Sequence, residues 1–127
     1  MSTAIVYSSM LGGTRRAAEY IGSKIGADVI NVKDAGDISK YDRIIIGSGV
    51  YAGRVPKSIV KLVKGSNHPN VYLFLSCLYN GEKGTAQLKK VSEDLDVKDA
   101  VFFNKIKKQI GVEGSELDEY ATRLSHN

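Results

Sequence analysis

With 127 residues and a mass of 13.8 kDa, the chain is long enough for one compact domain and leaves no room for a second of ordinary size. A composition of 43% apolar and 25% charged residues excludes a disordered or low-complexity chain. The single cysteine, Cys77, excludes an intramolecular disulfide and a multi-cysteine metal site, and His68 and His126 lack metal-ligand spacing. The formal net charge of +4 favours anionic ligands or partners but does not identify nucleic acid as one of them.

The sequence shows neither a membrane span nor a secretion signal. Its longest purely apolar stretches are short, such as residues 71–75, whereas a bilayer span needs roughly 20 residues. The first residues lack the positive segment and the long apolar segment of a secretion signal. We therefore expect a single cytoplasmic domain over residues 1–127, and we expect it to be a monomer.

The N-terminal half predicts alternating strands and helices. Residues 3–7 indicate a short buried strand, and residues 8–14 a polar turn that contains glycine. The helix that follows is expected to end at Gly26, and its apolar stripe consists of Ala17, Ala18, Ile21 and Ile25. Residues 28–32 predict a second strand and residues 42–47 a third, whose unbroken isoleucine run is typical of burial on both faces.

The C-terminal half repeats this alternation. Pro56 suits the first turn of a helix that Gly65 would close, and residues 71–75 are the strongest strand candidate. A further helix is expected after Gly84, and residues 101–103 form a weaker fifth strand. The apolar stripes of the two helices consist of Ile59, Leu62 and Val63, and of Leu88, Val91 and Leu95.

The last quarter of the chain is less regular. Residues 105–113 interleave basic and apolar side chains, which fits either a ragged extension of the fifth strand or a loop. Ser115 and Asp118 have the spacing of a capping-box variant, which predicts the start of a last helix. The buried stripe of that helix would consist of Leu117, Tyr120, Ala121 and Leu124.

Strands that alternate with amphipathic helices indicate an α/β fold with a parallel sheet covered on both faces. This follows because each right-handed crossover places a helix against the strands that it connects. In an open parallel sheet, ligands bind outside the carboxyl ends of the strands. The turns after the first, third and fourth strands are therefore the candidate binding segments.

The turn after the first strand has the composition of a phosphate-binding loop. Its hydroxyls, its glycines and the amides at the start of the next helix favour an anion, because the helix dipole adds its positive end. It is neither a Walker loop nor a three-glycine dinucleotide loop, which counts against ATP and NAD. The alternative is a plain strand-to-helix turn capped by Thr14. The candidate binding residues are Ser9, Met10, Leu11, Gly12, Gly13 and Thr14.

These residues resemble the phosphate loop of the flavodoxin family, which reads Thr/Ser-x-Thr-Gly-x-Thr directly after the first strand. Ser9, Gly12 and Thr14 match three of its four fixed positions, whereas Leu11 has no hydroxyl, so that contact would come from the backbone or from Ser8. The resemblance fades beyond Val101. It implies a flavodoxin-like three-layer sandwich, with five parallel strands in the order 2-1-3-4-5 and helices on both faces, and it implies FMN as the cofactor.

The resemblance also implies that the flavin ring lies between the loops after the third and fourth strands, usually against aromatic side chains. Tyr51 and Tyr79 occupy matching positions, although a loop tyrosine is often only a lid over the core. We expect Cys77 to be an inert neighbour of the ring, because no adjacent histidine activates it. The candidates are Ser48, Gly49, Val50, Tyr51, Ala52 and Gly53 in the first loop and Cys77, Leu78, Tyr79 and Asn80 in the second.

The first functional hypothesis is an electron carrier that passes one or two electrons between redox partner proteins. Such a protein needs no catalytic side chain, because the flavin supplies the chemistry. Arg15, Arg16, Arg54 and Lys57 lie in or just after the candidate loops and favour docking of acidic partners. They also favour negative charge on the reduced flavin, so we expect a less negative second-electron potential than in acidic relatives.

Two alternatives compete with the carrier. Residues 7–15 and 46–53 look most like the branch that contains menaquinone-dependent protoporphyrinogen dehydrogenases, in which the basic residues after the third strand would meet substrate carboxylates. Those enzymes carry an extra segment after the fourth strand that this chain lacks, and residues 80–84 offer little material for a pocket. A response-regulator domain would need acidic residues after the first and third strands, where residues 8–9 and 47–48 are Ser-Ser and Gly-Ser.

Overall fold

The computed structural model describes residues 2–10, 12–50, 54–77 and 81–126, the side chains of Cys77 and Glu82 excepted. Its strands are β1 (Thr3–Ser8), β2 (Asp28–Asn31), β3 (Arg43–Gly49), β4 (Val71–Cys77) and β5 (Asp99–Asn104). Its helices are α1 (Gly13–Ile25), α2 (Lys57–Ser66), α3 (Gly81–Leu95), α4 (Ile106–Gln109) and α5 (Glu116–Ser125), with a 3₁₀ turn η1 (Val32–Asp34) after β2. The strands form one parallel sheet in the order β2-β1-β3-β4-β5, which confirms the predicted fold class.

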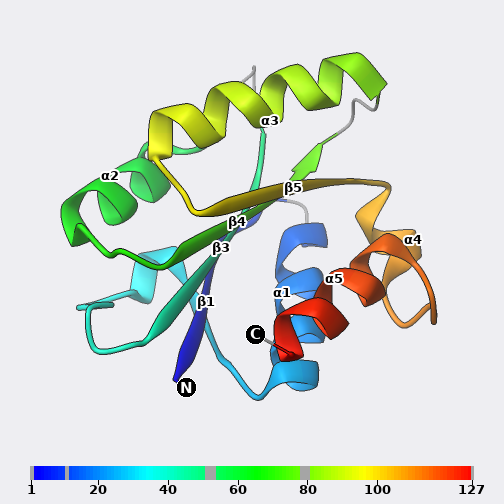
Figure 1. Ribbon diagram of the computed structural model, residues 1–127, viewed down its shortest axis with the longest axis horizontal. Coiled ribbons are helices and arrows are strands. Elements are labelled where there is room, and N and C mark those ends of the chain that lie inside the picture. Colours follow the sequence, from blue (N-terminus) through cyan, green and yellow to red (C-terminus); the bar gives the residue numbers. More distant parts are fainter. Residues whose placement is uncertain (1, 11, 51–53, 78–80, 127) are drawn as a thin grey trace.

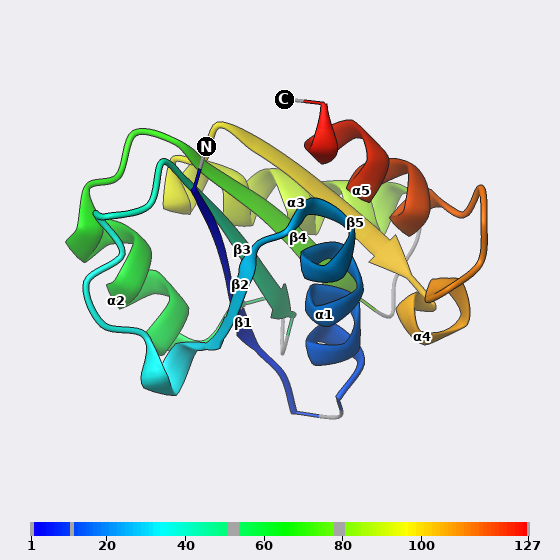
Figure 2. The ribbon, with the colours of Figure 1, turned by 90° about the horizontal axis from the view of Figure 1, so that it is seen from below.

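The sheet lies between two layers of helices, with α2 and α3 on one face and α1 and α5 on the other (Figures 1 and 2). β3 is in the middle and is buried along its whole length, as its isoleucine run predicted. Because successive side chains of a strand point to opposite faces, Ile44 and Ile46 join the α2–α3 side and Ile45 joins the α1–α5 side. Each such fully buried side chain stabilises the fold by about 1.5–3 kcal/mol relative to an exposed one.

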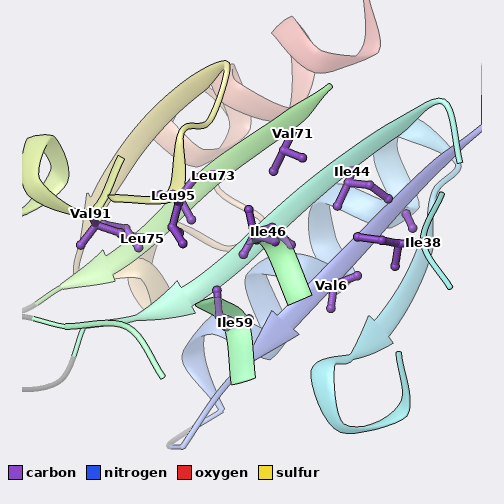
Figure 3. Close-up of a cluster of buried hydrophobic side chains, with 12 residues drawn as sticks. Val6, Ile38, Ile44, Ile46, Ile59, Val71, Leu73, Leu75, Val91 and Leu95 are labelled. Carbon is purple, nitrogen blue, oxygen red and sulfur yellow. The ribbon is translucent and has the colours of Figure 1, made fainter. Parts of the chain in front are cut away.

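The core on the α2–α3 side, which we call the first cluster, is aliphatic. Figure 3 shows Val6, Ile44 and Ile46 on the strands beneath Ile59 of α2, with Val91 and Leu95 of α3 beside β4. Ile59 and Val63 are the buried positions of α2, whereas Leu62 is only partly buried. The periodicity of both helices therefore predicted the correct faces.

The core on the α1–α5 side, the second cluster, contains three aromatic rings. The centroid of Phe74 lies 6.2 Å from that of Phe103 and 6.3 Å from that of Tyr120, and the last two are 5.6 Å apart. Phe74 occupies the space above Gly47, where an added Cβ would lie 2.3 Å from the Cζ atom of the ring. Gly47 is thus required by close packing across β3 and β4.

Several element boundaries differ from the sequence predictions. Gly26 ends α1 in the left-handed conformation, with φ of 71°, as predicted. The predicted end of α2 at Gly65 is wrong, because the left-handed residue that terminates this helix is Asn67, with φ of 50°. The predicted start of the next helix after Gly84 is also wrong, because α3 begins at Gly81. The sequence did not indicate this start, since the first turn of the helix carries no apolar stripe.

Residues 105–113 form neither a strand extension nor a simple loop, because they contain the short helix α4. Gln109 connects this segment to its neighbours. Its side-chain Nε2 donates to the carbonyl of Asn104 at 2.9 Å, and its Oε1 accepts from the amide of Leu117 at 2.8 Å. The end of β5, α4 and the start of α5 are therefore held together by one amide side chain.

The predicted cap of the last helix is half confirmed. Ser115 Oγ accepts a hydrogen bond from the amide of Asp118 at 3.1 Å, as the capping-box spacing requires. The carboxylate of Asp118 accepts instead from the amide of Gly114 at 3.0 Å, and its other oxygen accepts from Tyr20 Oη and Lys24 Nζ, both at 2.6 Å. These donors hold the pKa of Asp118 well below its usual range, Lys24 contributing most, and they tie α1 to α5.

A buried arginine lies under the end of α5. Arg43 is only 4% exposed and finds no carboxylate among the residues of the described segments. Its Nη1 donates to the carbonyl of Leu124 at 3.0 Å, and its Nε donates to Thr3 Oγ1 at 3.2 Å. The guanidinium also lies 5.8 Å from the ring centroid of Tyr72. Hydrogen bonds and a ring face therefore compensate for the burial of this charge.

Candidate functional site

The candidate site lies at the edge of the sheet where the strands end. Ser8 at the end of β1 is in register with Ser48 of β3, and Gly49 is in register with Ser76 of β4. Beyond the last residue of β3, the amide of Val50 donates to the carbonyl of Ser76 at 3.3 Å. The three turns that the sequence singled out therefore leave the sheet from adjacent positions, as the parallel topology requires.

The turn after β1 ends in a left-handed glycine that sets the direction of α1. Gly12 has φ of 86°, a conformation that costs glycine little, and its amide donates to Ser9 Oγ at 3.0 Å. The carbonyl of Gly12 already accepts from the amide of Arg16 at 3.0 Å, so the helix begins at the next residue. The amides of Gly13 and Thr14 make no hydrogen bond with any described residue, as expected in the first turn of a helix.

Thr14 lies inside the helix and does not cap it. The N-cap position belongs to Gly12, which has no side chain that could accept from the helix amides, so the capping role expected of Thr14 in the plain-turn alternative is wrong. Thr14 is 4% exposed, and its hydroxyl has no partner within the described segments. Ser9 is half-buried and Met10 is 73% exposed. The turn thus presents free amides and a free hydroxyl at the positive end of α1.

α4 forms the wall behind this turn, a role that the sequence pattern did not reveal. A Cβ added at Gly13 would lie 3.2 Å from Ile106 Cγ2 and 3.4 Å from two side-chain carbons of Lys107. Gly13 is therefore suited to the close approach of two helices. The first turn of α1 contains no acidic residue. With Lys107 beside it and Arg16 on its surface, the local charge favours an anion.

The end of β3 is more regular than predicted. Ser48 and Gly49 belong to the strand rather than to the loop after it, and both are buried. Ser48 Oγ donates to the carbonyl of Gly49 at 2.8 Å, which uses its hydroxyl within the strand. Val50 is partly buried and packs against the first cluster.

Several predicted site residues are not described by the structure. Cys77 is described only as the last backbone residue of β4. Seven others lie outside the described segments: Leu11, Tyr51, Ala52, Gly53, Leu78, Tyr79 and Asn80.

The basic residues around the site differ in their partners. Arg15 Nε lies 3.0 Å from Glu19 Oε1 in an exposed pair along α1, which contributes little to stability. Arg16, Arg54 and Lys57 are exposed and form no ion pair with the described part of the chain.

Within the described part of the chain, no three His, Cys, Asp or Glu side chains converge as a metal site would require, and no helix is long and apolar enough to cross a bilayer. The donors at the start of α1 fit a terminal phosphate.

Comparison with known proteins agrees with this geometry. A family model described as a flavodoxin domain matches residues 4–110. The two-electron reduced flavodoxin of Megasphaera elsdenii has a TM-score of 0.70 at 19% identity over 98% of this chain and 99% of that chain. A flavodoxin from the domain Archaea scores 0.68 at 19% identity over 99% and 97% of the two chains. A flavoprotein from Lactobacillus acidophilus in complex with FMN scores 0.66 at 22% identity over 80% and 92%.

The comparisons also set limits. No curated protein matches the chain in sequence, and at these identities the solved structures establish the fold alone. The family model extends nine residues past Val101 and includes α4, so the expectation that the resemblance fades there is wrong. The description of the model does not single out the protoporphyrinogen dehydrogenase branch.

Proposed function

Because this chain belongs to the flavodoxin family, we propose that it binds FMN and transfers electrons between redox proteins. The observation that carries this proposal is the first turn of α1, where unpaired amides and the Thr14 hydroxyl meet a helix start without acidic residues. When bound, FMN supplies one-electron and two-electron redox chemistry. No side-chain base among the described residues is needed for that role.

The proposed binding mode assigns a task to each turn. The amides of Gly13 and Thr14 hold the phosphate, and Ser9, whose oxygen accepts from Gly12, retains its own proton to donate. The loops that follow β3 and β4 flank the ring, with Tyr51 and Tyr79 against its faces. Support for this arrangement comes from the adjacent exits of the two strands, which the hydrogen bond from Val50 to Ser76 keeps together.

The charge distribution points to the partners. Arg16, Arg54 and Lys57 are exposed and unpaired within the described segments, so their fields extend into solvent. We expect acidic docking surfaces on the redox partners and a second-electron potential that is less negative than in acidic relatives. A potentiometric titration that gives a very low potential for the second electron would contradict the electrostatic part of this proposal.

The cofactor assignment is tested by the colour of the protein and by flavin fluorescence. The purified protein should be yellow, or it should quench the fluorescence of added FMN. Riboflavin lacks the phosphate and should bind at least about tenfold more weakly, because hydrogen bonds to a charged group contribute about 1.5–3 kcal/mol. A colourless protein that quenches neither compound would refute the proposal, and equal affinities would refute the phosphate site.

A flavin-dependent oxidoreductase of the protoporphyrinogen dehydrogenase type is the second candidate. The observation in its favour is the pair Arg54 and Lys57, which are exposed, lie close in sequence and are available to substrate carboxylates. Turnover of protoporphyrinogen by the FMN-loaded protein would support this candidate over a carrier. Electron transfer to a protein acceptor without such turnover would support the carrier.

A further inference from the structure

A cavity of about 310 Å³ lies between α2 and α3, on the face of the sheet opposite α1. Figure 1 shows the C-terminal end of α3 beside the start of α2, and both helices contribute to its lining. Its walls come from three segments of the chain: residues 54–55, the first half of α2 and the second half of α3. None of the α3 residues here was a predicted site residue.

The floor of the cavity is apolar. Val91 and Leu95 of α3 are 4% and 3% exposed and belong to the first cluster. Val55 and Val60 are half-buried and pack against the same cluster. The cavity thus offers an aliphatic surface continuous with the core, which suits an apolar group of a ligand.

The rim of the cavity carries an unbalanced positive charge. Arg54, Lys57 and Lys90 are exposed and form no ion pair with any described residue, and Asp94 is the one carboxylate in the lining. Lys57 is also the first residue of α2, where the helix dipole disfavours a cation. By contrast, Lys24 of α1 pairs with Asp118 at 2.6 Å. The three unpaired cations at the cavity are therefore available to anionic groups of a binding partner.

The cavity adjoins the proposed flavin site along the chain. Arg54 follows directly after residues 51–53, which form part of the predicted first flavin loop, and Lys57 starts the helix that continues from it. The three cations come from three different segments around the cavity, which suits a ligand that carries several carboxylates. The volume is at the lower end of the roughly 300–1,000 Å³ of small-molecule sites.

We propose that this cavity is the docking site for an acidic segment of a redox partner. An apolar side chain of that segment enters the cavity above Val91 and Leu95, and carboxylates on either side of it pair with Arg54, Lys57 and Lys90. The identification of the partner as a redox protein rests on the proposed function, whereas the chemistry of the docking segment rests on the cavity alone. The charge pairs guide the encounter, and the apolar contact fixes its position.

The test measures binding of a fluorescent peptide, a leucine flanked by aspartates and glutamates, to the FMN-loaded protein by anisotropy. We expect the double variant Arg54→Glu, Lys57→Glu to bind at least about tenfold more weakly than the natural protein. A matched control, Lys33→Glu with Lys61→Glu, changes the net charge equally at exposed residues outside the cavity lining and should change affinity less than about threefold. Equal losses in both variants would show non-specific attraction and overturn the proposal.

Two further arms examine the apolar contact. Replacing the peptide leucine by serine should weaken binding at least about tenfold, as should Val60→Trp, which fills the cavity without altering charge. A serine peptide that binds as well as the leucine peptide would overturn the proposal. Hexanoate, which has one carboxylate and an alkyl chain, is added as a competitor. If hexanoate binds more tightly than the peptide, the cavity is a site for a small molecule and the proposal is overturned. FMN affinity is measured separately on each variant. If the protein takes up no FMN, the same titrations are run on the unloaded protein, and peptide binding in the expected pattern would then uphold the docking site and refute the proposed function.

Discussion

The replacement Gly47→Ala tests whether the packing of the second cluster dictates the sequence at the end of β3. The new Cβ would lie 2.3, 2.7 and 2.9 Å from three carbons of the Phe74 ring, separations that real Cβ atoms essentially never show. The ring cannot turn away freely, because Phe74 is fully buried and is flanked by Phe103 and Tyr120. The backbone of β3 is paired on both sides and cannot shift freely either.

The expected loss of stability follows from two opposing effects. Inserting a methyl group into a well-packed core costs about 1–3 kcal/mol, and the contact with three ring atoms places this case in the upper part of that range. Alanine also restricts the unfolded chain, which stabilises the fold by about 0.4–1 kcal/mol. We therefore expect Gly47→Ala to lower the free energy of unfolding by about 1–2.5 kcal/mol, measured by urea denaturation with circular dichroism.

Two comparisons make the assay decisive. Gly65→Ala serves as the matched control, because Gly65 lies within α2 and nothing outside its chain neighbours and its own helix backbone comes within 4 Å of the added Cβ. This change should stabilise the protein by about 0.5–1 kcal/mol. In a Phe74→Leu background, the smaller side chain leaves room at Gly47 and should at least halve the loss. Unchanged stability of Gly47→Ala, or the same loss in both backgrounds, would refute the packing argument.

Two other replacements test the anion site and the link between α1 and α5. Gly12→Ala should weaken FMN binding by about tenfold in a fluorescence titration, because the left-handed conformation costs a residue with a Cβ about 1–2 kcal/mol; unchanged affinity would show that φ at Gly12 is not needed. The pKa of the Asp118 carboxyl is lower in the folded than in the unfolded protein. The ionised carboxylate therefore stabilises the fold at pH values above the unfolded pKa of about 3.9, and this stabilisation is lost as the pH falls below that value. Asp118→Asn should flatten the acid side of the profile of melting temperature against pH, and an acid limb as steep as in the natural protein would contradict this. The hydrogen bond to Asp118 raises the pKa of Lys24, so the contribution of this ion pair to stability should fade as the pH rises above about 10.4, the unfolded pKa of lysine.

Local patterns predicted the layers of this fold well. The stripes of α1, α2 and α5 name the buried face of each helix, because burial repeats with the helical period, and the unbroken isoleucine run of β3 indicates burial on both faces of the sheet. The strand order followed from the resemblance carried by Ser9, Gly12 and Thr14. The boundaries were less secure: Asn67 rather than Gly65 adopts the left-handed conformation, although glycine is the residue that the local sequence favours for that position.

The parts that sequence reasoning missed depend on contacts between distant residues. α4 starts after Lys105, whose φ of 53° is unusual for a residue with a side chain, and it is fixed by the hydrogen bonds of Gln109 to Asn104 and Leu117. Asp118 was expected only to cap its own helix, whereas its strongest partners lie on α1, more than ninety positions away. The approach of Ile106 to Gly13 is likewise invisible to any local pattern.

The burial of Arg43 bears on where this module can be cut. Similarity to the family model stops at residue 110, yet the carbonyl that receives the Arg43 guanidinium belongs to Leu124. A version trimmed at residue 110 would remove α5 from the layer that it forms with α1, and it would leave the Arg43 guanidinium without the carbonyl of Leu124. Fusions and transplants of the domain should therefore keep every residue through Leu124, because the contacts that satisfy Arg43 extend past the last residue matched by the family model.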